Sequence, residues 1–347
     1  MMNENISGQN TTEKFQDIQN LSSLKLGWFK ITPIGEPKMY ANGNQQCKVE
    51  IQIEKLIFDE KNSIWLKQSL TSAEISSIKI AEFSSNVLAS LPNGWYKDDT
   101  KNKFDIGFIS GTFSEMDEFG FDVNNDENFA QNSIEDGSLN VTERASYQVF
   151  TRFLRCASSV PIQPQKLMAT IRLDNGETYS THSVSDESYV TITPIAPYRI
   201  NVGNLLNHRR DDAYTANGYD VDIYYWQLPY SLRILEEVYS GQGHTSSKLL
   251  YFTDKKPKSK RFICATIKSN VSYLTIKDIV DYVNDTSSVN LKENNQFIRA
   301  LRFAFNSHVS TNYDNRLSYN ITDNFGCVHK YIFNSIENFN MLTISNG

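Results

Sequence analysis

CKVEIQIE, residues 47–54, decides the fold class, because hydrophobic and polar side chains alternate through it without a break. In an extended chain, successive side chains point to opposite faces of the sheet. Cys47, Val49, Ile51 and Ile53 would therefore share one face, and the charged and amide side chains between them would share the other. A period of two over eight residues predicts a half-buried β-strand.

The phrase just before this strand occurs a second time in the chain. Residues 40–43 read YANG, and residues 214–218 read YTANG. The second copy also precedes an alternating run, in which Val221, Ile223 and Tyr225 oppose Asp220 and Asp222. Two β-rich units in tandem are therefore the predicted architecture.

Further strands are predicted from short runs rich in β-branched and aromatic residues. These runs cover residues 78–80, 147–156, 189–195, 219–226, 248–252, 261–268, 316–322, 327–333 and 341–345. Residues 297–305 fit either a strand or a helix, and their aromatic content favours a strand. Residues 169–173 and 178–181 form the clearest hairpin, with Asn175-Gly176 expected to make a type I′ turn.

Helical patterns are few. Thr71-Ser-Ala-Glu74 has the form of a capping box and predicts one short helical turn. Residues 231–239 and 275–283 have apolar side chains at helical spacing, so we expect helices there as well.

These elements predict a mainly β protein with two tandem antiparallel β-sandwich-like domains, the second carrying one or two short helices. Residues 1–24 have too few apolar side chains to offset the entropy cost of ordering, and they are expected to form a flexible or partner-docked tail. The first domain is expected at 25–197, with a long acidic loop insertion at 114–140, and the second at 198–347. Pro194 and Pro197 mark the expected boundary.

Residues 28–195 resemble bacterial immunoglobulin-like domains of the invasin and intimin type. The resemblance rests on the glycine-containing lead-in at 41–43, the alternating strand that follows it, the strand at 147–156 and the Asn175-Gly176 hairpin. It implies a β-sandwich that serves as a spacer or binding module in adhesion, and it implies no catalytic residues.

The bulk composition limits the partners. The 347 residues carry a net charge of −6, which repels nucleic acid and anionic membranes. The basic cluster at 255–261 lies where a hairpin loop is expected, and we interpret it as a solvated loop. No signal peptide or run of 18 apolar residues is present, so we expect a chain without membrane insertion that is cytoplasmic, or released or particle-associated.

No metal or cofactor is predicted. The four cysteines lie in or beside apolar runs and are expected to be buried free thiols, with disulfides Cys47–Cys156 and Cys264–Cys327 as the alternative. The five histidines lie singly, without the spacing of a metal site. The oxygen-rich residues 122–128 fail the calcium-loop pattern, because Glu127 replaces the required glycine.

Aromatic clustering is the remaining indication of a site. Tyr224, Tyr225, Trp226 and Tyr230 lie close together in the sequence. They form core packing if their strand is central, and they form a sugar or protein surface if one face is open. The candidate binding residues are Tyr224, Trp226 and Tyr230.

Three functions remain open. The first is a non-catalytic structural or receptor-binding protein of a bacterial or phage-derived extracellular assembly, with a protein partner or self-association. The second is a lectin-like carbohydrate-binding module, with a glycan as the partner. The third is a glycoside hydrolase, which would need two carboxylates about 5–10 Å apart in a cleft.

Overall fold

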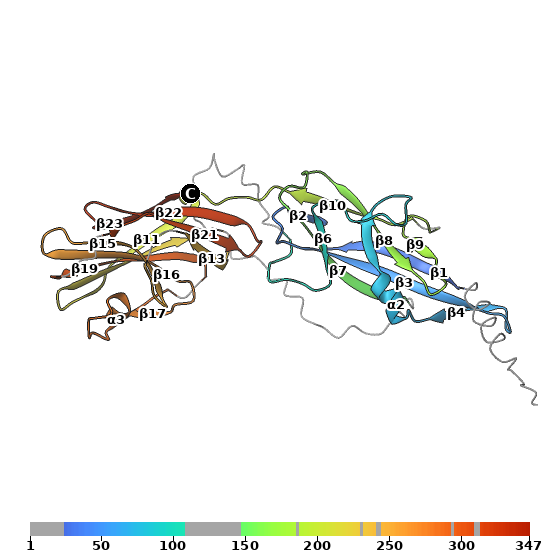
Figure 1. Ribbon diagram of the computed structural model, residues 1–347, viewed down its shortest axis with the longest axis horizontal. Helices are drawn as coiled ribbons and strands as arrows, with labels where there is room; N and C mark the ends of the chain where they lie inside the picture. Colours follow the sequence, from blue (N-terminus) through green and yellow to red (C-terminus); the bar gives the residue numbers. More distant parts are fainter. Residues whose placement is uncertain are drawn as a thin grey trace, which may run out of the picture. The chain divides into compact units, whose positions relative to one another are not determined.

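The computed structural model describes residues 24–107, 147–184, 187–229, 232–240, 244–292, 295–308 and 313–347. Within these residues the chain is mainly β, built from antiparallel sheets with two short α-helices, as the sequence predicts (Figure 1). The chain divides into two compact units. Unit 1 comprises Met1–Met39, Gln46–Lys101 and Ile106–Ile195, and unit 2 comprises Tyr40–Gln45, Asn102–Asp105 and Ala196–Gly347.

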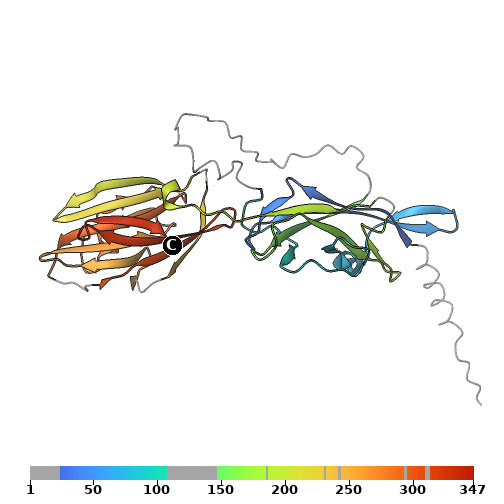
Figure 2. The same ribbon diagram turned by 90° about the horizontal axis from the view of Figure 1, so that it is seen from above.

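Unit 1 contains two sheets that pack face to face (Figure 2). One joins, in order, β1 (Leu24–Ile34), β3 (Cys47–Asp59), β7 (Gln148–Cys156) and β6 (Trp95–Asp98), with β4 (Ile64–Gln68) paired to the end of β3. The other joins β2 (Lys38–Tyr40), β10 (Val190–Ile195), β8 (Gln165–Arg172) and β5 (Lys79–Glu82), with β9 (Thr178–Ser180) beside β8.

Strand β3 confirms the alternation that the sequence predicts. Cys47, Val49, Ile51 and Ile53 are each at most 1% exposed, and the residues between them are half-buried. The strand also runs further than predicted, to Asp59, because its end pairs with β4 in a hairpin that projects past the other strands of unit 1 (Figure 2). All five residues of β4 are exposed.

The capping box predicted at Thr71 is present. It begins α2 (Ser72–Ser77): the Thr71 hydroxyl accepts from the Glu74 amide at 3.2 Å, and the Glu74 carboxylate accepts from the Thr71 amide at 2.8 Å. Glu74 is buried and also forms an ion pair with Lys55 of β3 at 2.8 Å. One carboxylate therefore both caps the helix and joins it to the sheet.

The hairpin at Asn175-Gly176 is confirmed, but the predicted type I′ turn is wrong. Gly176 has a φ of +86°, whereas Asn175 is absent from the positive-φ residues that a type I′ turn needs at both positions. The Leu173 carbonyl accepts from the Gly176 amide at 2.9 Å, and the Leu173 amide donates to the Glu177 carbonyl at 3.0 Å. These bonds define a three-residue loop in which Gly176 forms the bulge.

Unit 2 contains a seven-stranded and a four-stranded sheet. The larger joins, in order, β11 (Leu206–Ala216), β12 (Tyr219–Gln227), β19 (Phe297–Asn306), β16 (Lys260–Ile267), β15 (Leu249–Lys255) and β14 (His244–Thr245), with β20 (Tyr313–Asp314) paired to β15. The smaller joins β13 (Ile234–Ser240), β21 (Leu317–Asp323), β22 (Val328–Ile336) and β23 (Met341–Asn346).

The central strands of the seven-stranded sheet are buried on both faces. Trp226 and Phe252 on one face contact Phe333 of the smaller sheet, with ring centroids 5.6 and 5.7 Å apart. The other face is covered by β17 (Tyr273–Thr275), α3 (Ile276–Ile279) and β18 (Ser288–Asn290) (Figure 1). Unit 2 therefore has three layers.

Two helix predictions in unit 2 need correction. Residues 231–239 were expected to be helical, but Ile234–Ser240 form strand β13, because pairing with β21 outweighs the helical spacing of the side chains. Residues 275–283 form only one helical turn, α3, which Thr275 and Asp278 cap. After Ile279 the chain leaves the helix, and Val280 has a φ of −138°.

The two copies of the repeated phrase do not occupy equivalent places. Asn217 and Gly218 have φ values of +55° and +78° and form the two-residue type I′ turn between β11 and β12. Asn42 instead makes a local turn, in which its side chain accepts from the amides of Asn44 and Gln45 at 2.9 Å. Both copies of the phrase therefore form turns, but they do not precede structurally equivalent strands.

Several sequence predictions lie outside the described residues. They are the flexible tail up to residue 23, the acidic insertion at 114–140 with its calcium-like pattern, and Tyr230. The four cysteines lie within the described part and are buried free thiols, as expected. In the described residues, neither helix has the length and apolar character needed to cross a membrane.

Candidate ligand-binding pockets

Residues 268–292 lie as a separate layer over the outer face of the seven-stranded sheet, and we call them the cover segment. Their apolar side chains pack on alternate residues of β12, β19, β16 and β15. The buried members of the cover segment are Val271, Leu274, Ile276, Ile279, Val280, Val289 and Leu291.

A buried arginine fastens this segment to the sheet. Arg299 of β19 is 2% exposed and donates to the carbonyls of Lys268 at 2.5 Å, Val271 at 2.7 Å and Lys292 at 3.3 Å. These carbonyls lie at both ends of the cover segment, so a single guanidinium holds both ends. Burial lowers the pKa of Arg299, although nearby Glu237 acts in the opposite direction.

A pocket opens on each side of the cover segment. One is lined by β15, β16 and residues 278–282, and the other by β11, β12 and residues 290–292. Strand β19 separates β12 from β16 in the sheet, so the two pockets flank the covered centre.

The first pocket, the tyrosine pocket, has a volume of about 600 Å³. Its aromatic lining consists of Tyr251, Tyr282 and Tyr313. Its apolar lining consists of Ile263, Ile279 and Val280. Ser246, Asp254, Arg261, Asp278 and Asp281 supply the polar groups. Such a mixture of apolar surface and a few polar groups is typical of small-molecule sites.

An ion pair lies at the buried side of the tyrosine pocket. Arg261, 5% exposed, donates through Nε to Asp254 at 2.7 Å and through Nη2 to the second oxygen of the same carboxylate. Its Nη1 donates to the Tyr282 hydroxyl at 2.7 Å. The hydrogen bonds with Asp254 raise the pKa of Arg261, so its charge is permanent and already balanced.

The polar groups of Tyr251 and Asp278 in this pocket are also held in place. The Tyr251 hydroxyl lies 3.0 Å from the carbonyls of Asp278 and Ile279, and burial raises the pKa of Tyr251 to about 12. Burial acts to raise the pKa of Asp278, but bonds from Lys248 and Thr275 outweigh it and lower the pKa. At neutral pH the Tyr251 phenol is therefore neutral, and Asp278 is ionised beside Lys248, 2.8 Å away.

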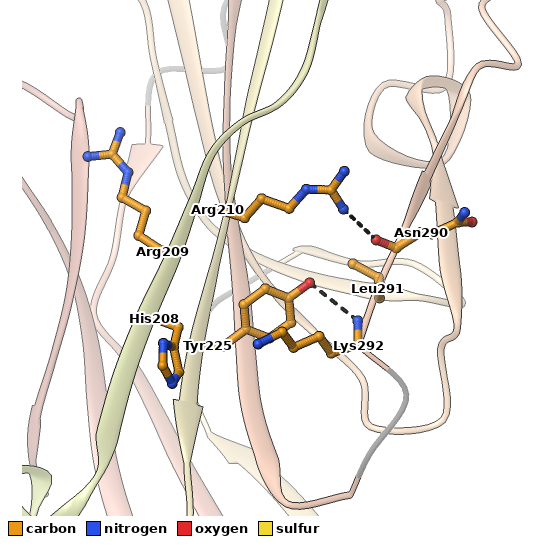
Figure 3. A pocket seen from close by; sticks show the side chains of 7 residues that line it. All are labelled: His208, Arg209, Arg210, Tyr225, Asn290, Leu291 and Lys292. Atoms are coloured by element: carbon orange, nitrogen blue, oxygen red, sulfur yellow. Dashed lines mark hydrogen bonds between the residues drawn. The ribbon is translucent and has the colours of Figure 1, made fainter.

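The second pocket, the basic pocket, has a volume of about 500 Å³ and is drawn in Figure 3. Its lining consists of His208, Arg209, Arg210, Tyr225, Asn290, Leu291 and Lys292. Arg210 reaches from β11 to the Asn290 carbonyl at 3.0 Å, whereas Arg209 points away on the other side of the strand (Figure 3). None of these seven described residues is acidic.

The structure places two of the predicted binding residues, Tyr224 and Trp226, in the core. Tyr224 and Trp226 are each 3% exposed, and their rings stack with centroids 5.9 Å apart between the two sheets of unit 2. Neither ring has an exposed face for a sugar, because β12 is a central strand and the packing alternative applies. Tyr230 lies outside the described residues.

Sequence reasoning did not identify either pocket. The three pocket tyrosines belong to β15, to the middle of the cover segment and to β20. No spacing in the chain indicates that they meet, since their proximity depends on how the cover segment lies on the sheet.

Three carboxylates come together near the start of β12. Single oxygens of Asp211, Asp212 and Asp222 lie within 4.8 Å of one another. Asp222 is already paired with Arg209 at 2.7 Å and with Arg302 at 3.0 Å. Two guanidinium groups balance its charge, which removes the attraction that would hold a cation.

A histidine–aspartate pair is fully buried in unit 2. His329 Nε2 lies 3.0 Å from Asp323, and His329 Nδ1 accepts from the Ile200 amide at 3.0 Å. The proton therefore lies on Nε2. Burial raises the pKa of the neighbouring Cys327 thiol to about 12, which makes it a poor nucleophile at neutral pH. This group is structural.

No protein-family model matches the chain, and no curated protein matches it. The geometry of the pockets is therefore the basis for assigning a function.

Proposed function

We propose that this protein is a non-catalytic receptor-binding protein that holds a neutral carbohydrate in the tyrosine pocket. The observation that carries the proposal is the composition of this pocket: tyrosine rings beside two ion pairs, Arg261–Asp254 and Lys248–Asp278, with exposed Asp281 as a further carboxylate. Sugars present both apolar C–H faces and many hydroxyls, so they suit a surface that offers rings and polar groups together.

The electrostatics favour a neutral ligand over an ionic one. The charge of Arg261 is compensated by Asp254, and that of Asp278 by Lys248. A charged ligand would have to displace one of these partners and leave a buried charge unpaired, which is costly. A neutral polyol can hydrogen-bond to the tyrosine hydroxyls and the carboxylate oxygens without breaking either pair.

The same pairing supports binding without turnover. A glycosidase needs one carboxylic acid with a raised pKa to protonate the leaving group. The pKa of Asp278 is lowered, and both oxygens of Asp254 accept from Arg261. We therefore favour recognition over hydrolysis, with unit 1 acting as the scaffold that its resemblance to invasin-type domains implies.

A glycan array probed with the full-length protein tests this function. The array should carry neutral oligosaccharides of glucose, galactose, mannose and N-acetylglucosamine beside acidic ones. We expect binding to neutral glycans that falls at least tenfold in Tyr282→Ala, since this ring is 57% exposed and its removal leaves the core intact.

Tyr273→Ala is the matched control, because Tyr273 is 49% exposed on the same cover segment and does not line the tyrosine pocket. Its binding should equal that of the wild type. Failure to bind any neutral glycan, or equal binding by the Tyr282 and wild-type proteins, would contradict the proposal.

A further inference from the structure

The basic pocket has a chemistry opposite to that of the tyrosine pocket. Its described lining carries three permanent cations together with His208. Arg209 is paired with Asp211 and Asp222, which leaves Arg210 and Lys292 as the cations that face a ligand. The chain as a whole has a net charge of −6, so a concave site without an acidic lining residue departs from the average surface.

The two cations keep donors available. Arg210 uses Nη1 for the Asn290 carbonyl at 3.0 Å, and its Nε and Nη2 have no hydrogen-bond partner among the described residues. The Lys292 ammonium lies 5.6 Å from the Tyr225 ring centroid and 5.5 Å from that of Phe297. Neither side chain forms an ion pair with a described carboxylate.

The scaffold holds these two groups at a fixed separation. The Arg210 bond ties β11 to the end of β18, and the Lys292 amide donates to the Tyr225 hydroxyl at 3.4 Å (Figure 3). The Lys292 carbonyl in turn accepts from buried Arg299. The cations are therefore attached to a sheet and to a fastened segment, which makes the pocket preorganised.

We propose that the basic pocket is a second ligand site, which binds the phosphate, sulfate or carboxylate group of a small anionic ligand. A guanidinium offers two parallel N–H donors to such a group, and an ammonium adds a point charge. The volume of about 500 Å³ exceeds that of a single inorganic ion and has room for a sugar-sized body attached to the anionic group.

This site is independent of the neutral-carbohydrate site, because the cover segment and β19 lie between the two pockets. A failure to bind neutral glycans would leave the inference standing, and a failure to bind anions would leave the proposed function standing.

Titration calorimetry of the full-length protein tests the inference with four probes: inorganic phosphate, inorganic sulfate, glucose 6-phosphate and glucose. We expect glucose 6-phosphate to bind more tightly than glucose, whose only site on this protein would be the tyrosine pocket. Stronger binding of glucose 6-phosphate than of inorganic phosphate would identify an anionic sugar as the ligand, and equal binding would identify the anion alone.

The decisive variant is Arg210→Gln with Lys292→Gln, both exposed residues whose replacement leaves the core intact. Its affinity for glucose 6-phosphate should fall at least tenfold. Lys255→Gln with Lys256→Gln is the matched control, since it removes the same charge from the end of β15 and the first residue of the loop after it, outside the basic pocket.

The control variant should bind like the wild type. An equal loss of affinity in both double variants would mean nonspecific attraction and would overturn the inference, as would an absence of binding by the wild type. Equal thermal unfolding midpoints for the three proteins would exclude misfolding as the cause of a loss.

Discussion

Lys55 places an ammonium group inside unit 1, where the residue is only 3% exposed, and its partner Glu74 is 1% exposed. Removing one member of a buried ion pair leaves the other charge uncompensated in the low-dielectric interior of the protein. Lys55→Met should therefore lower the free energy of unfolding by about 3–5 kcal/mol. Urea denaturation of the full-length protein measures this change.

Lys67→Met is the matched control. Lys67 forms an ion pair with Glu54 at 2.7 Å, but its side chain is 56% exposed. Exposed pairs contribute about 0–1 kcal/mol. Similar losses in the two variants would contradict our account of Lys55, because burial would then have no effect on the cost.

At the scale of elements, the cover segment depends on Arg299. Arg299→Leu removes three hydrogen bonds from a charged donor, each worth roughly 1.5–3 kcal/mol. We expect amide exchange to accelerate across residues 268–292, while β21 and β22 in the other sheet stay protected. Hydrogen exchange followed by mass spectrometry on peptides resolves the two regions.

Arg299→Lys serves as the comparison, because it keeps the charge but has fewer directed donors. Its exchange should lie between those of the wild type and Arg299→Leu. If exchange in residues 268–292 were the same in all three proteins, packing alone would hold the segment and the role assigned to Arg299 would be wrong.

Whether an element could be predicted depends on whether its local sequence or its contacts with distant residues determine its structure. Strand β3 was predictable because its buried and half-buried side chains alternate in step with the apolar and polar residues of its sequence. Strand β13 was missed because its pairing with β21, more than 70 residues away along the chain, determines its structure. The Asn175-Gly176 turn differs in type because a third residue, Asp174, lies in the loop, where its amide donates to Glu74 at 3.1 Å.

At the scale of the molecule, the mainly β class was predictable and the pockets were not. The pockets form where the cover segment lies across strands from distant parts of the chain, and such positions leave no spacing in the sequence. The tyrosines that the sequence does cluster, in 224–225, lie in a central strand and have buried side chains.

The whole molecule should lose stability in alkali. Burial raises the pKa of Cys47 and Cys327 to about 12 and that of Cys156 to about 11, above the ordinary value of 9.0. A raised pKa means that the folded state keeps protons that the unfolded chain releases. The stability these thiols contribute is thus fully present below pH 9 and declines as the pH rises toward the folded values.

Each such thiol should lower the free energy of unfolding by about 1.4 kcal/mol per pH unit in this window. Urea denaturation with a reductant, from pH 7 to pH 11, tests this. Replacing Cys156 with alanine should make the decline shallower. A free energy of unfolding that stays level up to pH 11 would show that the thiols are accessible to water in the folded state.

The two compact units are nested in the sequence. Tyr40–Gln45 and Asn102–Asp105 belong to unit 2 but are encoded within the stretch that supplies unit 1. In them, Asn42 donates to the Phe325 carbonyl at 3.0 Å, and Asp105 accepts from Arg233 at 2.7 Å. No single crossover in the gene can therefore transfer unit 2 intact to another protein. Recombination between related genes would therefore tend to pass on the whole coding sequence. A domain that is encoded by one contiguous stretch can instead be transferred by itself.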